Sequence, residues 1–382
     1  MTSLGHKELK KILLTPFLII IIASIYLLQT RYLPSKTTIG PAPFEFTATA
    51  QKTQSVKAPI LIVGDTMGFR LSKFKEVLEK ELSANYTDGI KVETIATEGE
   101  SIYRTLHKIQ NLKQLPLIIL LLSNYDTARE SVFRDRDILK IKNNIQLYKN
   151  EYIKTALMIF PELAKIIYEP VKPVLLSAKI LNRPKIKNDT ILQNRKLIHY
   201  SLYEFALEDM YTYTKKANSL IINLTTPLNL SIPPTKSCDG SISSNSLEEY
   251  EKASMAFAKK DFKLTYNLSK ELVLLNPTHA ESQFLLSQSA FKLRHFNDYK
   301  QAGELAISLD CSLRSGDPVF NSIMKKLSTQ YEVPMLNFHK LLIDQSQSNY
   351  TFIEDIYPQD LYFEKVINTI SKLIKKRLRL TL

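Results

Sequence analysis

The chain of 382 residues contains no tryptophan, only two cysteines and only nine glycines. The glycines form no loop of the kind that cradles a nucleotide phosphate, and the histidines and cysteines show no metal-ligand spacing. We therefore expect no cofactor and no metal ion. No cysteine lies near the apolar segment at the N-terminus, which excludes a lipoprotein. Cys238 and Cys311 could pair in an exported chain or remain two free thiols, and the sequence leaves both open.

Positive charge is in excess, at a formal net +13, and it is unevenly distributed. Residues 129–200 carry 15 Lys and Arg against 7 Asp and Glu, and five more cations lie within residues 372–379. The C-terminal cations are interpreted as the end of a helix, where they complement its dipole. The basic segment is either a solvated face or a surface for anionic lipid or an acidic partner. We expect no nucleic-acid partner.

The longest apolar run covers residues 12–30, "ILLTPFLIIIIASIYLLQT", which are 19 uncharged residues. As a helix this run is about 28 Å long, close to the thickness of the hydrocarbon core of a bilayer. Three lysines lie within residues 1–11, so the positive-inside rule leaves the N-terminus in the cytoplasm. No small-residue cleavage site follows the run at the right distance, so we predict an uncleaved transmembrane anchor rather than a signal peptide. The predicted protein is single-pass in the inner (cytoplasmic) membrane, with its bulk in the periplasm.

After a linker predicted at residues 31–58, apolar runs of strand length alternate with helical patterns. Residues 59–64 and 115–124 are the clearest runs, and both are apolar at nearly every position. Parallel strands covered by helices on both faces produce this pattern, so we predict an α/β core. The predicted parts of the chain after the linker are core residues 59–127, a basic helical insertion at 128–216, a strand and loop at 217–245, helical repeats at 246–315, and the last part of the core at 316–382.

A spacing of 34 residues recurs within the predicted repeats. Ala256-Phe257 recurs as Ala290-Phe291, and Phe262 recurs as Phe296. Small residues let paired helices approach, and the aromatic residues fill the gap to the next pair. This resembles tetratricopeptide (TPR) repeats, for which chance helical hairpins are the alternative. The resemblance implies binding of other envelope or membrane proteins through these repeats.

The segment "GDTMG", residues 64–68, follows the first apolar run. Its hydroxyl, that of Thr66, is predicted at the carboxyl edge of the sheet, where open α/β folds place their sites. Gly99 follows a second predicted strand, residues 90–97, and Asn124 ends a third, residues 115–124. The segment "EDIYPQD" precedes the last helical pattern. In this order the motifs resemble the SGNH (GDSL-type) hydrolases. The resemblance implies a flavodoxin-like five-stranded parallel sheet, a nucleophile at residue 66, and oxyanion donors from Gly99 and Asn124.

The departures from that family concern the reacting groups. Thr66 stands in place of the nucleophilic Ser, Glu354 in place of Asp, and Tyr357 in place of the His. A tyrosine, with an ordinary pKa of about 10, cannot accept a proton near neutral pH as an imidazole does. His339, after the last strand, is the only stand-in base that the sequence offers. We therefore expect a degenerate site without a proton acceptor.

Three functions remain open from the sequence. The first is a binding or scaffold protein of a bacterial cell-envelope assembly, such as a periplasmic flagellar-motor collar or a glycan-modification complex. The second is an acyl esterase or O-acetyltransferase that acts on envelope carbohydrate, with Thr66 as nucleophile and His339 as base. The third is a cleft that binds an acyl or sugar ligand without reaction.

Overall fold

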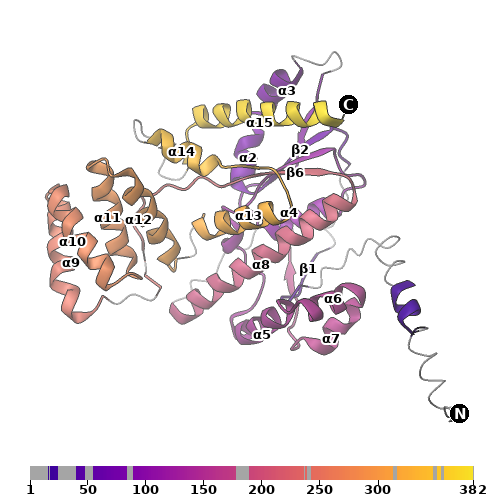
Figure 1. The fold of residues 1–382 in the computed structure, drawn as a ribbon, viewed down its shortest axis with the longest axis horizontal. Coiled ribbons are helices and arrows are strands. Elements are labelled where there is room, and N and C mark those ends of the chain that lie inside the picture. The colour runs from indigo at the N-terminus through magenta and orange to yellow at the C-terminus, as the bar shows by residue number, and fades with distance from the viewer. Residues whose placement is uncertain are drawn as a thin grey trace, which may run out of the picture. The chain divides into compact units, whose positions relative to one another are not determined.

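The computed structural model describes residues 16, 18–24, 40–47, 55–83, 89–177, 189–235, 237–238, 242–312, 316–346, 351–353 and 357–381. The chain divides into two compact units. The smaller unit combines Met1–Pro41 with Leu139–Val171, and the larger combines Ala42–Ile138 with Lys172–Leu382. Figure 1 shows the elements of both units, which are described separately here.

The larger unit is built on a five-stranded parallel sheet, as predicted. Its strands, in spatial order, are β3 (Val92–Thr94), β2 (Ile60–Gly64), β4 (Ile118–Leu122), β6 (Leu220–Leu224) and β7 (Met335–Leu336). In chain order this is 2-1-3-4-5, the flavodoxin-like arrangement, whose topological switch point lies between the first and third strands. Here that point lies between β2 and β4.

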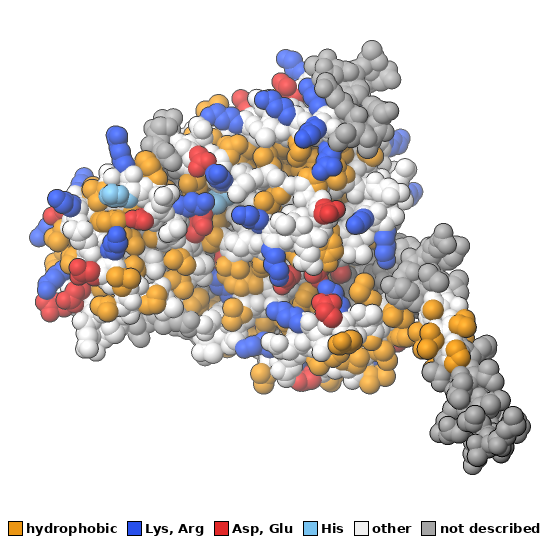
Figure 2. Space-filling view, viewed as in Figure 1, with side chains coloured by type: hydrophobic (Ala, Val, Ile, Leu, Met, Phe, Trp, Pro, Cys, Tyr) orange, Lys and Arg blue, Asp and Glu red, His pale blue; other side chains and the backbone are white. Residues whose placement is uncertain are grey.

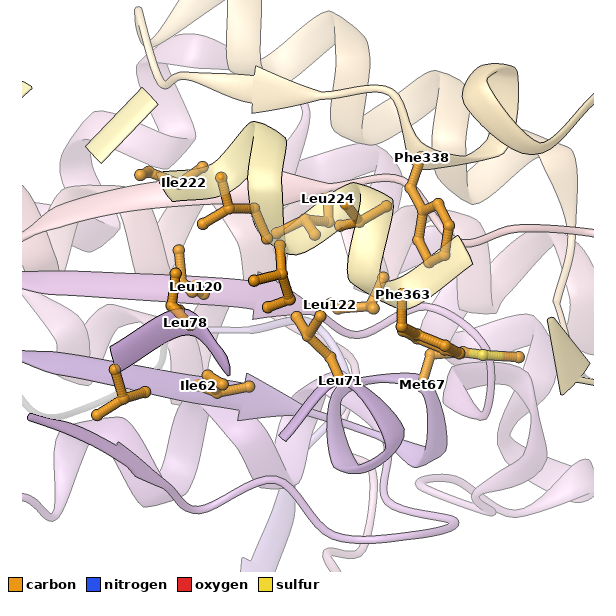
Figure 3. Packing of buried hydrophobic residues seen from close by; sticks show 14 of the residues in the cluster. Ile62, Met67, Leu71, Leu78, Leu120, Leu122, Ile222, Leu224, Phe338 and Phe363 are labelled. Carbon is orange, nitrogen blue, oxygen red and sulfur yellow. The ribbon is translucent and has the colours of Figure 1, made fainter. Parts of the chain in front are cut away.

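Helices cover both faces of the sheet because its central strands are apolar on both sides. Alternate strand residues such as Ile62, Leu120 and Ile222 form one core cluster with Leu71 and Phe363 (Figure 3). The helices that contribute to this cluster are α2 (Thr66–Ser72), α3 (Lys75–Ser83), α14 (Phe338–Ser346) and α15 (Asp360–Thr381). The other face contacts α4 (Ile102–Gln110) and α8 (Asp189–Lys216), and α8 also contacts α13 (Pro318–Gln330).

Gly64 provides the sharp exit from β2 that its position in the sequence predicts. Its φ is +141°, and a Cβ there would lie 1.9 Å from the carbonyl oxygen of Leu122. Only glycine fits such a backbone. Asp65 then caps α2, because its Oδ1 accepts the backbone N–H of Met67 at 3.0 Å. Strand, turn and helix start are therefore fixed by three consecutive residues, 64–66.

Among the described residues, five α-helices lie between β6 and β7 in the chain, and we call the first four, residues 247–309, the helical unit. These four are α9 (Leu247–Ala258), α10 (Phe262–Leu275), α11 (Ala280–Lys292) and α12 (Phe296–Leu309). The turns inside the two hairpins are equivalent at the predicted spacing. Lys260 and Arg294, 34 residues apart, have φ of 61° and 64°, and the next residue in each turn donates its N–H to Ala256 or Ala290. The repeat in the sequence is thus a repeat in the backbone.

A disulfide closes the base of the helical unit. Cys238 and Cys311 are bonded, with their Cα atoms 4.7 Å apart. The N–H of Cys238 donates to the carbonyl of Leu309 beside it, at 2.9 Å. Of the two states that the sequence left open, the structure has the paired one.

The basic segment predicted at residues 128–216 is distributed over both units. Its last helix, α8, belongs to the layer on the sheet, whereas residues 139–171 belong to the smaller unit. The elements before α8 are the short 3₁₀ helices η2 (Thr127–Arg129), η3 (Asp135–Asp137) and η4 (Pro161–Leu163), the helices α5 (Ile138–Tyr148), α6 (Glu151–Ile159) and α7 (Ala164–Ile167), and strand β5 (Val174–Leu176).

Part of the segment predicted as a linker is structured. Within it, β1 (Phe44–Phe46) pairs in parallel with β5. A contact between rings supports this strand, because the half-buried ring of Phe46 stacks on His107 at 3.8 Å between centroids. Two further short strands, β8 (Phe352–Ile353) and β9 (Tyr357–Pro358), form one antiparallel pair, and η5 (Ser244–Ser246) precedes α9.

The predicted anchor at residues 12–30 lies mostly outside the described residues. Pro16 and Leu18–Ser24 are helical, and the side chains of Leu18–Ile22 are exposed. Within the described part of the chain, no helix combines the length and hydropathy that a membrane crossing requires.

Candidate functional site

The candidate site lies at the carboxyl ends of β2 and β4, at the switch point of the sheet. Thr66 begins the helix after β2, and Asn124 and Asp126 follow β4. All three side chains are buried, with Thr66 only 5% exposed. The structure therefore brings residue 66 to the sheet edge that its sequence position predicts.

Asp65 holds the loop after β4 against the start of α2. Its Oδ2 accepts the backbone N–H groups of Tyr125 at 2.6 Å and of Asp126 at 3.1 Å. Burial, and secondly the negative charge of Asp126, raise the pKa of the Asp65 carboxyl well above its usual range. This residue thus fixes the position of Asp126 relative to Thr66.

Thr66 makes three hydrogen bonds within the site. Its hydroxyl donates to Asp126 Oδ2 at 2.5 Å, and its backbone N–H approaches the same oxygen at 3.3 Å. The hydroxyl also accepts the N–H of Gly99 at 2.8 Å. Sequence reasoning expected no proton acceptor here, and it missed Asp126. The signal was present, because an aspartate follows Asn124 by two residues at the end of a buried strand.

Asn124, predicted as an oxyanion donor, donates instead to a side chain of α13. Its Nδ2 donates to Asn321 Oδ1 at 2.7 Å. Asn321 lies on α13 and also bonds both the N–H and the carbonyl of Thr226, each at 2.8 Å. The amide of Asn124 is thereby tied to the loop after β6.

Tyr357, which the sequence resemblance predicted to stand in place of a histidine, begins β9 and lies in the antiparallel β8–β9 pair. The guanidinium of Arg70 lies over its ring, 3.6 Å from the centroid. The ring of Tyr125 is 6.4 Å away. A cation over the ring face is a favourable packing arrangement. Glu354, predicted to stand for the family's aspartate, lies outside the described residues.

His339 is hydrogen-bonded away from Thr66. Its Nδ1 accepts the N–H of Leu228 at 3.2 Å. The remaining proton is then on Nε2, which donates to Glu304 Oε1 at 3.1 Å. Both ring nitrogens of the predicted stand-in base are therefore occupied by groups other than the hydroxyl of Thr66.

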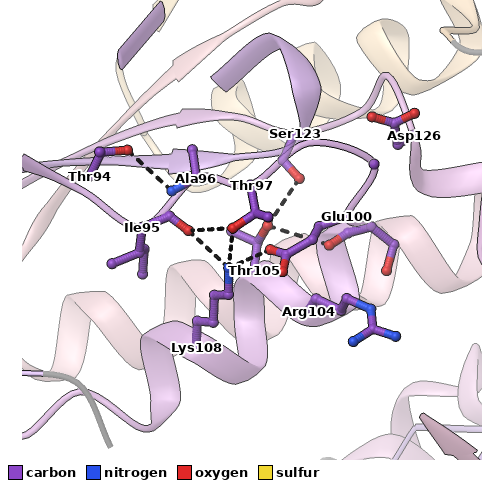
Figure 4. Close-up of polar contacts among 12 residues, drawn as sticks. Thr94, Ile95, Ala96, Thr97, Glu100, Arg104, Thr105, Lys108, Ser123 and Asp126 are labelled. Atoms are coloured by element: carbon purple, nitrogen blue, oxygen red, sulfur yellow. Dashed lines mark hydrogen bonds and ion pairs between the residues drawn. The ribbon is translucent and has the colours of Figure 1, made fainter. Parts of the chain in front are cut away.

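A polar network centred on Lys108 supports the loop that carries Gly99 (Figure 4). Lys108 Nζ bonds Glu100 Oε2 at 2.5 Å, Thr97 Oγ1 at 2.7 Å and the carbonyl of Ile95 at 3.0 Å. Burial raises the pKa of Glu100, and the charge of Lys108 opposes that rise. This cluster fixes the loop on both sides of Gly99.

A second buried ion pair anchors the start of α4. Arg104 and Glu130 are 2.6 Å apart, with side chains only 5% and 2% exposed. Glu130 also accepts the hydroxyl of Ser101, two residues after Gly99. The position of the Gly99 N–H therefore depends on the Lys108 cluster and on the Arg104–Glu130 ion pair, neither of which was predicted from the sequence. Among the described residues, no three His, Cys, Asp or Glu side chains are arranged to hold a metal ion.

No family model matches the sequence, and no curated protein matches it. Among solved structures, the chain is similar to the crystal structure of a putative acylhydrolase from Bacteroides fragilis NCTC 9343, with a TM-score of 0.35 and 9% identity. That alignment covers 86% of this chain and 94% of the other. What the site can do is set by its own side chains.

Proposed function

We propose that this protein is a membrane-anchored, extracytoplasmic binding or scaffold protein of a cell-envelope assembly, and that its SGNH-like site is not a hydrolase. One observation carries the proposal. The three groups that would bind an oxyanion, the N–H of Thr66, the N–H of Gly99 and the side chain of Asn124, all donate to acceptors of the chain itself.

Such a closed site opposes acyl transfer. A tetrahedral intermediate needs free donors where its negative charge develops. Here the carboxylate of Asp126 lies beside the N–H of Thr66, so a developing oxyanion would meet a negative charge. The hydroxyl has no imidazole partner, since Tyr357 packs on Arg70 and His339 bonds Leu228 and Glu304. We expect catalysis to have been lost with these changes.

The helical unit is the part that we expect to bind proteins, as TPR repeats do. A segment of the chain already packs on its α11–α12 side. Gln288 donates to the carbonyl of Leu230 at 2.8 Å, and a Cβ on Gly303 would lie 2.9 Å from Leu230 Cβ. The exposed apolar side chains of α10 remain, with Leu274 78% and Leu275 72% exposed. We propose this face of α10 as the protein-binding surface.

The anchor and the disulfide support an extracytoplasmic location. Residues 12–30 have the length and apolar composition of a membrane span. A bonded Cys238–Cys311 pair is typical of a protein in an oxidising compartment. Both features agree with a short cytoplasmic N-terminus and a periplasmic bulk.

The scaffold role is tested by photo-cross-linking in native membranes. A photoreactive side chain at position 275 should capture a defined envelope protein, identified by mass spectrometry, and Leu274→Arg should abolish the capture. The same side chain at Val77 on α3, also an exposed apolar position, is the control. Equal capture at positions 77 and 275, or capture that survives Leu274→Arg, would count against this surface.

One observation favours the second candidate, an acyl esterase or O-acetyltransferase. The 2.5 Å hydrogen bond to Asp126 puts a possible base on the Thr66 hydroxyl. Carboxylates are in general far weaker bases than imidazole toward an alcohol. We expect no turnover of aryl acetates and no fluorophosphonate adduct on the full chain. Turnover or labelling that Thr66→Ala abolishes would establish the enzyme instead.

A further inference from the structure

The smaller unit exposes a group of large apolar side chains. Tyr152 is 88% exposed, Met158 55%, Phe160 42% and Ile166 80%, and we call these four residues the apolar face. They lie on α6, on α7 and on the residue that follows α6. Figure 2 shows hydrophobic side chains gathered over these helices. A single exposed apolar residue needs no explanation, but a group of this kind marks a binding surface.

The same stretch of the chain carries an excess of lysine. Residues 139–171 contain five lysines and three glutamates, which gives a net charge of 5 − 3 = +2. Glu162 forms an ion pair within the unit, with its Oε2 2.6 Å from Lys165 Nζ. A second glutamate, Glu169, accepts from Asn143 at 2.5 Å. Aromatic and aliphatic side chains beside lysines are the composition of helices that lie in the interface of an anionic bilayer.

The chain keeps this unit close to the predicted anchor. The side chain of Asn144 on α5 donates to the carbonyl of Pro41 at 3.4 Å. Pro41 follows Thr30, the last residue of the apolar run, by 11 residues (41 − 30). Eleven residues span at most about 40 Å when fully extended. If residues 12–30 cross the bilayer, α5 therefore cannot move farther than that from the membrane surface.

We propose that the apolar face docks onto the anionic surface of the membrane that residues 12–30 cross, with its lysines at the lipid headgroups. This inference rests on the anchor in the proposed function. Docking would hold α5–α7 in the headgroup layer. The membrane is favoured over a protein partner because the tether, the excess of lysine and the exposed aromatic ring of Tyr152 all fit a bilayer interface.

The absence of tryptophan makes the test direct. Single tryptophans are introduced into the full chain as Ile166→Trp on the apolar face, Ile20→Trp in the predicted anchor, and Leu275→Trp on the helical unit. Each variant is reconstituted into vesicles of phosphatidylglycerol and phosphatidylethanolamine with brominated acyl chains. The tryptophan is excited where tyrosine does not absorb. We expect strong quenching at positions 20 and 166 and none at position 275. Position 275 is a suitable comparison because Leu275 is 72% exposed, close to the 80% of Ile166.

The outcomes separate this inference from the anchor. Quenching at position 20 without quenching at 166 overturns the docking and leaves the anchor intact. No quenching at either position overturns both. Quenching at 275 equal to that at 166 also overturns a specific docking face.

Charge variants test the role of the lipid headgroups. In vesicles of phosphatidylcholine alone, quenching at 166 should fall while quenching at 20 stays. Lys149→Gln and Lys165→Gln each remove one positive charge and should each lower the docked-to-undocked ratio roughly fivefold. Lys80→Gln on α3 is the matched control and should leave the ratio unchanged. Quenching at 166 that is independent of lipid charge and of these lysines would overturn the anionic surface as the binding partner.

Discussion

The carboxylate oxygen Oδ2 of Asp126 receives both the hydroxyl of Thr66, at 2.5 Å, and the backbone N–H of the same residue, at 3.3 Å. Both the hydroxyl and the backbone N–H of Thr66 are therefore held by one carboxylate of the chain. Because the N–H group begins helix α2, the negative charge also lies at the favourable end of the helix dipole. This pair is structural as it stands, and its contribution can be measured.

Replacing Thr66 by valine keeps the shape of the side chain and removes its hydroxyl. The Asp126 carboxylate then loses a donor and the N–H of Gly99 loses its acceptor, both in a buried site. We expect the free energy of unfolding to fall by about 2–3 kcal/mol, since unmade buried hydrogen bonds cost that much. Thr66→Ser keeps the hydroxyl and should cost much less. Urea denaturation followed by circular dichroism compares the two; equal stability of both variants would contradict the expectation.

Asp126→Asn should flatten the dependence of stability on pH. The pKa of Asp65 is raised in the folded chain, so the folded state binds more protons between the ordinary pKa and the raised one. Stability therefore falls as pH rises through that interval, which begins at about 4. Removing the charge of Asp126 should lower the pKa of Asp65 in the folded chain. The pH range over which stability falls then becomes narrower.

The measurement for Asp126→Asn is the free energy of unfolding as a function of pH upward from the ordinary aspartate pKa. Glu271→Gln, an exposed carboxylate on α10, is the control that removes one charge elsewhere. A pH slope for Asp126→Asn that equals the slope of this control would show that the two aspartates are not coupled.

The Arg104–Glu130 ion pair should be worth far more than an exposed one. Glu130→Gln leaves the buried guanidinium of Arg104 without its counter-charge, which we expect to cost about 3–5 kcal/mol. Glu162→Gln breaks the exposed pair with Lys165, at a cost below about 1 kcal/mol. Thermal unfolding of the two variants checks the difference. If both variants show similarly small shifts in unfolding temperature, the Arg104–Glu130 pair does not stabilise the loop that carries Gly99.

The Cys238–Cys311 bond should stabilise the helical unit by limiting the unfolded chain. The bonded residues are 73 apart, so replacing both by serine should cost about 4 kcal/mol in the chain-entropy account. Faster amide hydrogen exchange should appear first in α9–α12. Thiol titration of the unfolded, unreduced chain is the direct check, and two reactive thiols there would refute the bond.

Much of the fold was predictable from local patterns. Apolar runs such as residues 59–64 and 115–124 became strands, because a run apolar on both faces is stable only when both faces are covered. The 34-residue spacing became two hairpins with equivalent turns at Lys260 and Arg294. The short strand β1 was missed, because three residues of a linker-like segment carry no period and are held by distant aromatic rings.

What the sequence determined by itself was the order of strands and helices, the sharp turn at Gly64 and the 34-residue repeat. The tertiary structure alone decided the hydrogen-bond partners. Thr66 meets a residue 60 positions away, and Asn124 meets one 197 positions away. Hydrophobic periodicity depends on residues close together in the sequence. The pairing of buried donors and acceptors depends instead on which loops the sheet brings to one edge. That pairing decides whether the donors at the site bond to the chain itself or remain available to a ligand.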